Sequence, residues 1–185
     1  NDNPYSFILN EGEHLSILAI DGAKECCIEL NSMSKSHNMP GWRVGMLAAN
    51  AEFVSWILKV KSNIDSGTFR AVQLAAAAAM DNDEDWHREH NVRRYAERRT
   101  LAESIMQALG CRFDRAQTGL FLWGRIPDAL ADAEELTERA LHEADVFITP
   151  GGIFGQNGRR YVRISLCADE NRMSDALARI QNVFA

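Results

Sequence analysis

The sequence lacks any apolar stretch long enough to cross a membrane, and it lacks a signal-peptide pattern. It also lacks an excess of positive charge, because 20 lysines and arginines are outnumbered by 26 aspartates and glutamates, which gives a formal net charge of −6. The acidic balance argues against a nucleic-acid partner, and the missing apolar stretch argues against a membrane partner. Since 46% of the residues are hydrophobic, the chain can still bury a core.

Cysteine is scarce, and its four positions form no known pattern. Cys26 and Cys27 are adjacent, whereas Cys111 and Cys167 stand alone. This spacing matches neither a metal site nor a disulfide framework. We therefore expect reduced cysteines in the core of a cytoplasmic protein.

The 185 residues are enough for one large or two small domains, and they begin with Asn1 rather than methionine. We expect the chain to be part of a longer protein. The acidic run 81–85 is the best candidate for a boundary, and it separates a first domain, 1–84, from a second, 85–185. We interpret the run as a solvated helix start, not a metal site, because no histidine or cysteine sits at ligand spacing with it. His87 and His90 are spaced three apart with no visible third ligand, so we expect no metal there either.

The most informative stretch is 31–45, which reads NSMSKSHNMPGWRVG between two apolar, strand-like segments, 26–30 and 44–49. A lysine on a loop between buried strands is costly unless its amine is used. A desolvated lysine loses its proton readily, and the neutral amine can attack a carbonyl to form a Schiff base. Lys35 is this lysine, and the hydroxyl and guanidinium groups that suit a nearby phosphate belong to Ser32, Ser34 and Arg43. Pyridoxal phosphate (PLP) needs this combination, because it has an aldehyde and a phosphate on one ring.

The serine–lysine motif 32–35, followed by Gly-Trp-Arg-Val-Gly at 41–45, resembles the cofactor-lysine signature of the class I/II aminotransferases, which are fold-type I PLP enzymes. The resemblance covers the whole chain and implies an α/β fold that is the C-terminal half of such an enzyme. Residues 1–84 would be the end of the large, mostly parallel PLP-binding domain, and residues 85–185 the small α+β domain. The resemblance also implies a homodimer for the full-length protein.

The resemblance assigns roles to individual residues. Lys35 would bind the cofactor as a Schiff base and later move a proton from the substrate's α-carbon. Asp2 would pair with the pyridine nitrogen, and Tyr5 would bond to the ring's phenolic oxygen. The remaining cofactor contacts would be phosphate contacts, from Ser32, Ser34 and Arg43. The family's main phosphate loop, its stacking aromatic ring and an asparagine that contacts cofactor and substrate are missing here, so we expect the isolated chain to bind PLP poorly and to be inactive.

A second informative stretch is 160–166, where apolar and polar residues alternate. Val162, Ile164 and Leu166 are expected to face a core, with Arg163 on the opposite face. A fixed guanidinium there could bind a substrate carboxylate through two hydrogen bonds. Together with the Pro-Gly-Gly-x-Phe-Gly run at 150–155, the stretch resembles the family's C-terminal motif, whose arginine binds the α-carboxylate of the amino acid.

Elsewhere the pattern predicts a helix capped by Asn50, a helix over 71–80 capped by Thr68, and a long helix over 86–109 that presents a solvated, arginine-rich face. Strands are predicted over 119–126 and 146–149, with a helical region between Pro127 and Ala144. Asp169 is predicted to cap the last helix.

The sequence is compatible with several functions. We favour an aminotransferase that acts on an amino acid and a 2-oxo acid, whose identities the sequence does not reveal. A lyase on the same scaffold would use the same lysine. The sensor domain of a PLP-dependent transcription regulator and a structural module with a degenerate site also fit the pattern.

Overall fold

The computed structural model describes residues 1–184 and divides the chain into two compact units, the first Asn1–Val92 and the second beginning at Arg93. The boundary expected between residues 84 and 85 lies inside a short helix, α5 (Asp83–Trp86). Within the described residues, no helix has both the length and the apolar character needed to cross a membrane.

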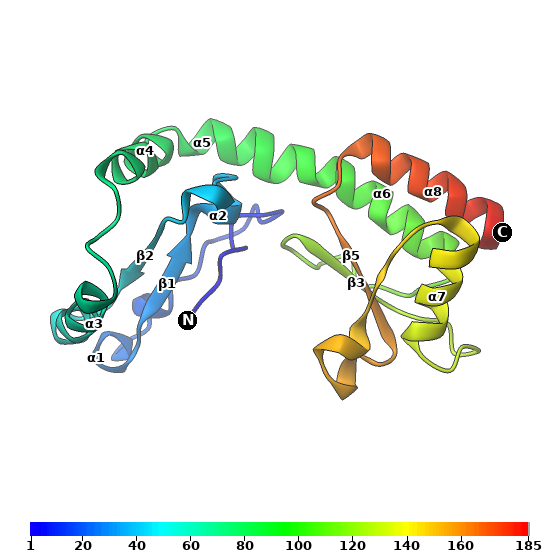
Figure 1. The fold of residues 1–185 in the computed structure, drawn as a ribbon, viewed down its shortest axis with the longest axis horizontal. Helices are drawn as coiled ribbons and strands as arrows, with labels where there is room; N and C mark the ends of the chain where they lie inside the picture. Colours follow the sequence, from blue (N-terminus) through cyan, green and yellow to red (C-terminus); the bar gives the residue numbers. More distant parts are fainter. Residues whose placement is uncertain (185) are drawn as a thin grey trace. The chain divides into compact units, whose positions relative to one another are not determined.

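The first unit is built around two antiparallel strands, β1 (Glu29–Ser32) and β2 (Gly45–Ala48), which are drawn side by side in Figure 1. The N-terminal segment lies along β1, where Asp2 forms a single parallel bridge to Leu30. The expectation of two buried strands is wrong within residues 1–184, because the nearby core is small and leaves Leu30 and Met46 exposed. That core consists of Met33, Met39 and Ala76.

Helices complete the first unit. They are η1 (Ile17–Ala19), α1 (Ala23–Cys26), α2 (Met33–Ser36), η2 (Pro40–Trp42), α3 (Ala51–Ile64), α4 (Arg70–Met80) and α5. Asn50 caps α3 as predicted, because its Oδ1 accepts a hydrogen bond from the Phe53 N–H at 2.9 Å. The predicted Thr68 cap is wrong: Phe69 is the N-cap of α4 and makes no side-chain capping bond.

A π-helical segment, η3 (His87–Arg94), interrupts the long helix that the sequence predicted. An α-helix, α6 (Tyr95–Ala108), follows it and ends one residue before the predicted end at 109; Gly110 comes directly after residue 109, with a φ of 71° that favours glycine. Runs of π-helix are rare and are frequently found at functional sites.

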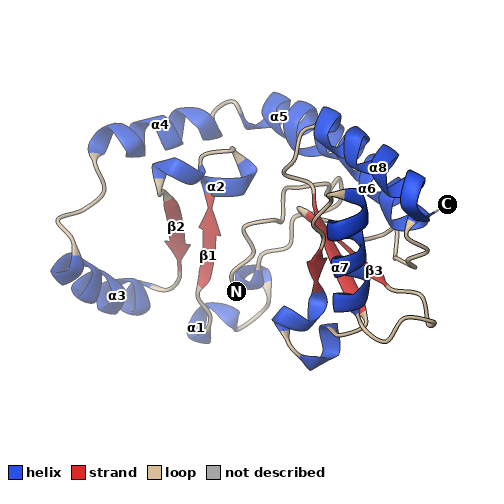
Figure 2. Cartoon of the chain, turned by 45° about the vertical axis from the view of Figure 1, so that its right-hand side comes forward, coloured by secondary structure: helices blue, strands red, loops and turns tan. Residues whose placement is uncertain are grey.

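The second unit combines a three-stranded antiparallel sheet with helices (Figure 2). Its elements after α6 are β3 (Phe121–Arg125), α7 (Ala133–Ala144), β4 (Thr149–Pro150), η4 (Gly151–Phe154), η5 (Gln156–Gly158), β5 (Tyr161–Ser165) and α8 (Glu170–Phe184). The strand order is β3-β5-β4, so β5 is central. The predicted strand 146–149 is wrong except at Thr149, and the helix begins at Ala133, because Asp132 caps it there.

The alternation along β5 has the predicted consequence. Val162, Ile164 and Leu166 are buried, whereas Tyr161 and Ser165 are exposed. The α6 and α8 helices lie side by side in Figures 1 and 2. Asp169 caps α8 as predicted, since its Oδ1 accepts from the Arg172 N–H at 2.9 Å.

All four cysteines are free thiols, but only one lies in the core. Cys111 is buried, and this burial raises the pKa of its thiol to about 12, so the thiol stays protonated at neutral pH. Cys26 and Cys167 are exposed and Cys27 is half-buried. The prediction of core cysteines is therefore correct for Cys111 alone.

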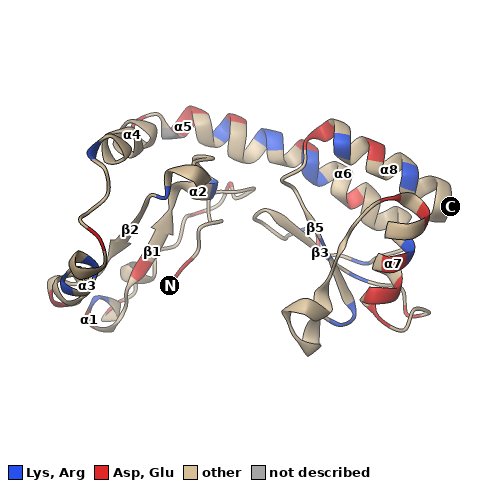
Figure 3. Ribbon diagram, in the orientation of Figure 1, with Lys and Arg blue, Asp and Glu red and all other residues tan. Residues whose placement is uncertain are grey.

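The predicted solvated, arginine-rich face is correct for Arg93 and Arg94, which are exposed, and wrong for the two arginines at 98 and 99 on α6. Figure 3 shows cationic and anionic residues interspersed along α6 and α8, and many of these charges form pairs. The side chains of Arg98 and Arg99 are only 13% and 9% exposed. Arg98 Nε donates to Glu170 at 2.8 Å. The backbone N–H of Glu170 and, after it, this contact with Arg98 lower the pKa of the Glu170 carboxyl.

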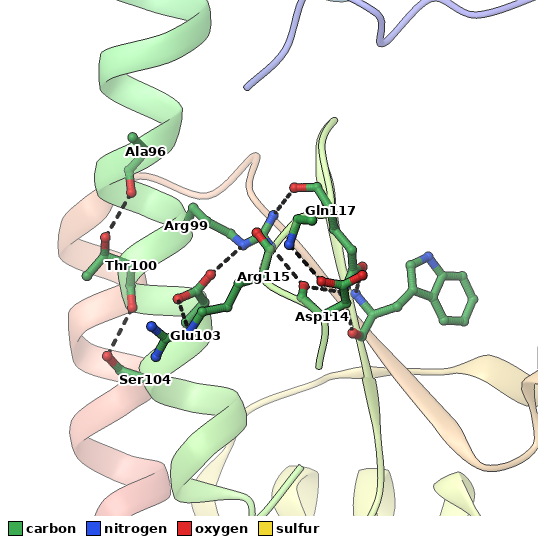
Figure 4. Close-up of polar contacts among 10 residues, drawn as sticks. Ala96, Arg99, Thr100, Glu103, Ser104, Asp114, Arg115 and Gln117 are labelled. Carbon is green, nitrogen blue, oxygen red and sulfur yellow. Dashed lines mark hydrogen bonds and ion pairs between the residues drawn. The ribbon is translucent and has the colours of Figure 1, made fainter. Parts of the chain in front are cut away.

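Arg99 connects α6 to the loop that precedes β3 (Figure 4). Its guanidinium donates to the Gln117 carbonyl at 2.8 Å, to the Asp114 carbonyl at 3.4 Å and to the Glu103 carboxylate at 3.0 Å. Gln117 in turn exchanges hydrogen bonds with the backbone of Trp123 at 2.9 and 3.0 Å. One buried arginine thus fixes the approach to β3.

Arg99→Met is expected to lower the free energy of unfolding by about 3 kcal/mol, because the loop carbonyls and Glu103 lose a buried donor. Urea unfolding of the complete protein measures the loss. Arg179→Met is the matched control, since the Arg179–Asp175 pair on α8 is exposed, and it is expected to cost at most about 0.5 kcal/mol. Equal costs for the two variants would contradict the buried role of Arg99.

Candidate active site

The segment from β1 to β2 folds back on itself. Ser32 pairs with Gly45 across the two strands, and the Met33 N–H donates to the Val44 carbonyl at 3.3 Å. The one-turn helix α2 and the turn η2 connect the strands at this end. The fold therefore places the backbone of residues 32–33 beside that of residues 44–45.

Lys35 lies in the last turn of α2, not on an open loop as the sequence predicted. Ser32 is the N-cap of this helix, and its hydroxyl oxygen accepts a hydrogen bond from the Ser34 N–H at 3.2 Å. That bond fixes the Ser32 hydroxyl oxygen and leaves its proton available for another acceptor. Lys35 is half-buried, and its amine makes no hydrogen bond or ion pair within the described part of the chain.

Arg43 follows η2 in a strained backbone conformation. Its φ is 51°, in the left-handed region, which costs about 1–2 kcal/mol for a residue other than glycine. One guanidinium nitrogen donates to the Pro40 carbonyl at 2.7 Å, and the side chain is otherwise exposed. Strain of this kind is concentrated at functional sites.

Asp2 and Tyr5 lie one strand away. The parallel bridge from Asp2 to Leu30 and the hydrogen bond from the Leu30 N–H to the Asn1 carbonyl, 2.8 Å, hold the N-terminus along β1. Tyr5 is half-buried in the turn that follows, where its carbonyl accepts from the Ile8 N–H at 2.9 Å. The structure records no side-chain contact that joins Asp2 or Tyr5 to Lys35 or Arg43 among residues 1–184.

Arg163 belongs to the second unit, on the central strand β5, between Trp123 of β3 and Thr149 of β4. Its guanidinium carbon lies 4.1 Å from the centre of the Phe121 ring and 4.3 Å from that of Phe154. Its Nε is buried and has no hydrogen-bond partner among the described residues. Two aromatic rings therefore contact the Arg163 guanidinium, and its Nε–H remains free to donate a hydrogen bond as far as residues 1–184 are concerned.

The sequence reasoning missed both aromatic neighbours of Arg163. Strand alternation could have identified Phe121, because it shares a strand and a face with Trp123, the residue paired with Arg163. Phe154 is in η4, outside the sheet; it is the phenylalanine of the Pro-Gly-Gly-x-Phe-Gly run, but that run alone did not indicate a contact with Arg163.

A cavity of about 330 Å³ lies beside α2 in the first unit. Its lining is mainly apolar and includes Met33, Val44, Met46 and Met80, together with Ser32. Lys35 is not among the residues that line it, although its neighbours Ser32 and Ser36 are.

A family model described as aminotransferase class I and II matches residues 5–180. The chain belongs to this family. The match includes Lys35, Arg43 and Arg163, and the family uses PLP as its cofactor.

Relatives with known names agree with this assignment. The chain is 39% identical over 171 residues to an LL-diaminopimelate aminotransferase of Nitratidesulfovibrio vulgaris, and the aligned region covers 91% of the chain and 43% of that relative. It is 38% identical over 185 residues to an LL-diaminopimelate aminotransferase of Aquifex aeolicus, with 99% of the chain and 47% of the relative covered. The chain thus spans about half the length of the curated relatives it matches.

Solved structures show the same fold. The BacF structure from Bacillus subtilis in its apo form superposes with a TM-score of 0.85 at 29% identity and covers all of the chain and 47% of BacF. A probable N-succinyldiaminopimelate aminotransferase from Thermus thermophilus gives a TM-score of 0.84 at 33% identity, with 98% of the chain and 48% of that protein covered. The predicted α/β fold, as a C-terminal part of an aminotransferase, is confirmed.

Proposed function

We propose that the complete protein is a PLP-dependent aminotransferase in which Lys35 binds the cofactor. The observation that supports this most directly is the β1–α2–η2–β2 fold, in which the half-buried lysine, the capping Ser32 and the strained Arg43 belong to one folded segment. Their chemistry fits the cofactor: an amine for the aldehyde, and hydroxyl and guanidinium donors for the phosphate.

PLP, when bound, supplies a ring that accepts the electron pair left on the substrate's α-carbon. The chain's own groups do the rest in this proposal. The Lys35 amine would take the proton from the substrate's α-carbon and deliver it to the carbonyl carbon of the cofactor. Phosphate contacts come from Ser32, Ser34 and Arg43. Asp2 keeps the ring nitrogen protonated, and Tyr5 donates a hydrogen bond to the ring's phenolic oxygen.

Arg163 is proposed to bind the α-carboxylate of the substrate. A carboxylate accepts two parallel N–H bonds from a guanidinium, and the Phe121 and Phe154 rings lie close to that of Arg163. These two contacts restrain the side chain, which reduces the entropy that it loses when the carboxylate binds.

We further propose that residues 1–84 belong to the large PLP-binding domain and residues 85–185 to the small domain, and that the complete protein is a cytoplasmic homodimer. The family match and the half-length coverage of the relatives support this arrangement. Size-exclusion chromatography of the complete protein tests the dimer.

The amino donor is proposed to be LL-diaminopimelate, because relatives named LL-diaminopimelate aminotransferase are 36–39% identical to this chain. The complete protein, supplied with PLP, LL-diaminopimelate and 2-oxoglutarate, is expected to form glutamate in step with loss of the donor. Chromatographic analysis of the amino acids measures both.

A panel of different amino donors, tested with the same acceptor, is the control for this assay. A preference for another donor would leave the aminotransferase and reject the substrate. Release of ammonia and a 2-oxo acid without use of 2-oxoglutarate would instead indicate a lyase.

A further inference from the structure

The last residue of α2, Ser36, receives two hydrogen bonds from a distant part of the first unit. Its carbonyl oxygen accepts from the Trp86 indole Nε1 and from the Asn91 side-chain Nδ2, each at 2.7 Å. These donors are 50 and 55 residues further along the chain. Ser36 directly follows Lys35 in the backbone, so the two donors hold the Ser36–His37 peptide group, one residue beyond the lysine.

The two donors are themselves held in place. Asn91 is fully buried in η3, its Oδ1 lies 3.1 Å from His90 Nδ1, and its backbone carbonyl accepts from the Leu9 N–H at 3.0 Å. The Trp86 ring stacks on the His90 ring with centres 4.2 Å apart and planes 15° apart. Trp86 directly precedes the π-helical segment, and Asn91 lies within it, five residues further on. Because a π-helix forms i→i+5 hydrogen bonds, this spacing places both side chains on the same side of the helix, where they reach one carbonyl.

A helix of four residues needs such support. One turn of helix fixes several backbone dihedrals in return for very few hydrogen bonds, so α2 is not stable by itself. Ser32 satisfies its N-terminal end, and the His37 N–H bonds to the Met33 carbonyl at 3.2 Å. The Ser36 carbonyl has no partner within the helix and depends on Trp86 and Asn91.

We propose that Trp86 and Asn91 are positioning residues for Lys35. By binding the Ser36 carbonyl they fix the orientation of α2, and therefore the direction in which the lysine amine points. The inference rests on the proposed role of Lys35 as the cofactor lysine. An error of about 1 Å in the position of a reacting group can lower a rate by about 10²-fold. The hydrogen bonds to the Ser36 carbonyl can therefore affect turnover although they do not touch the reacting atoms.

The test uses two variants of the complete protein. Trp86→Phe removes one N–H and keeps the stacked ring; Asn91→Asp keeps the size and replaces the donor with an acceptor. We expect kcat to fall about threefold for Trp86→Phe and about tenfold or more for Asn91→Asp, with KM for the amino donor within twofold of wild type. The matched controls are Trp56→Phe and Asn82→Ala, both at exposed positions of the same unit, and both are expected to leave kcat unchanged.

A second readout does not need the cofactor. In the cofactor-free protein, competitive acetylation followed by mass spectrometry gives the labelling rate of each lysine at one pH. The rate at Lys35 is expected to change at least threefold in both variants, while the rate at the exposed Lys24 stays constant. A merely structural role would lower thermal stability and leave both the Lys35 labelling rate and the kcat of the folded protein unchanged.

The outcomes separate this inference from the proposed function. If Lys35→Ala remains active, the proposed function has failed. If Lys35→Ala is inactive while Trp86→Phe and Asn91→Asp match the controls in kcat and in labelling, only the positioning role is overturned. Should Asn91→Asp not fold, the milder Trp86→Phe alone decides between these results.

Discussion

Lys35→Ala in the complete protein is expected to abolish the visible absorption of bound cofactor and to lower turnover at least about 10³-fold. The alanine has no amine to bond the cofactor and none to move the α-proton. The visible absorption spectrum measures the first effect through the band of the lysine-bound cofactor, and glutamate formation measures the second.

Two further variants make this experiment specific. Lys35→Arg keeps a long basic side chain, but its guanidinium does not give up a proton near neutral pH, so the variant is expected to be as inactive as the alanine. Lys59→Ala removes an exposed lysine on α3 of the same unit and is expected to behave as wild type. Retention of both the absorption band and turnover in Lys35→Ala would falsify the assignment of the cofactor lysine.

Local signals in the sequence are sufficient for much of the fold. Asn50 and Asp169 are recognisable as helix caps because the N–H that each side chain caps is only three residues further along the chain. The alternation at 162–166 predicts the buried face of β5, since a strand core needs only a period of two. Lys35, Arg43 and Arg163 stand out in the same way, from short motifs with a chemical meaning.

Features that depend on distant contacts are not predictable from local patterns. The arginines at 98 and 99 have a composition typical of a solvated helix face, and only the loop at 114–117 and Glu170 explain why they are buried. The four-residue helix α2 has the composition of a loop because its support comes from Trp86 and Asn91, more than fifty residues away in one case. The exposure of parts of β1 and β2 has the same explanation. The apolar composition of a strand shows that its side chains favour burial, but it does not show which other segment covers them.

Arg163→Met in the complete protein is expected to lower kcat/KM for the amino donor by about 10²- to 10³-fold, since losing a desolvated, two-fold hydrogen-bonded charge pair costs about 3–4 kcal/mol. Arg163→Lys keeps the charge without the planar fork and is expected to recover only a small part of the loss. Steady-state kinetics with the amino donor varied provide the measurement. Arg172→Met, at a side chain that is 83% exposed on α8, is the control and is expected to stay within twofold of wild type.

Phe154 gives this prediction a sharper form. Its ring lies over the Arg163 guanidinium at 4.3 Å, and such a contact is worth about 0.5–2 kcal/mol, so Phe154→Leu is expected to lower kcat/KM about three- to tenfold. If Phe154 acts only by fixing Arg163, adding Phe154→Leu to Arg163→Met removes nothing more, because the group it orients is already gone. Fully additive losses would mean that Phe154 contacts the donor directly, and an Arg163→Met variant within threefold of wild type would mean that the carboxylate binds elsewhere.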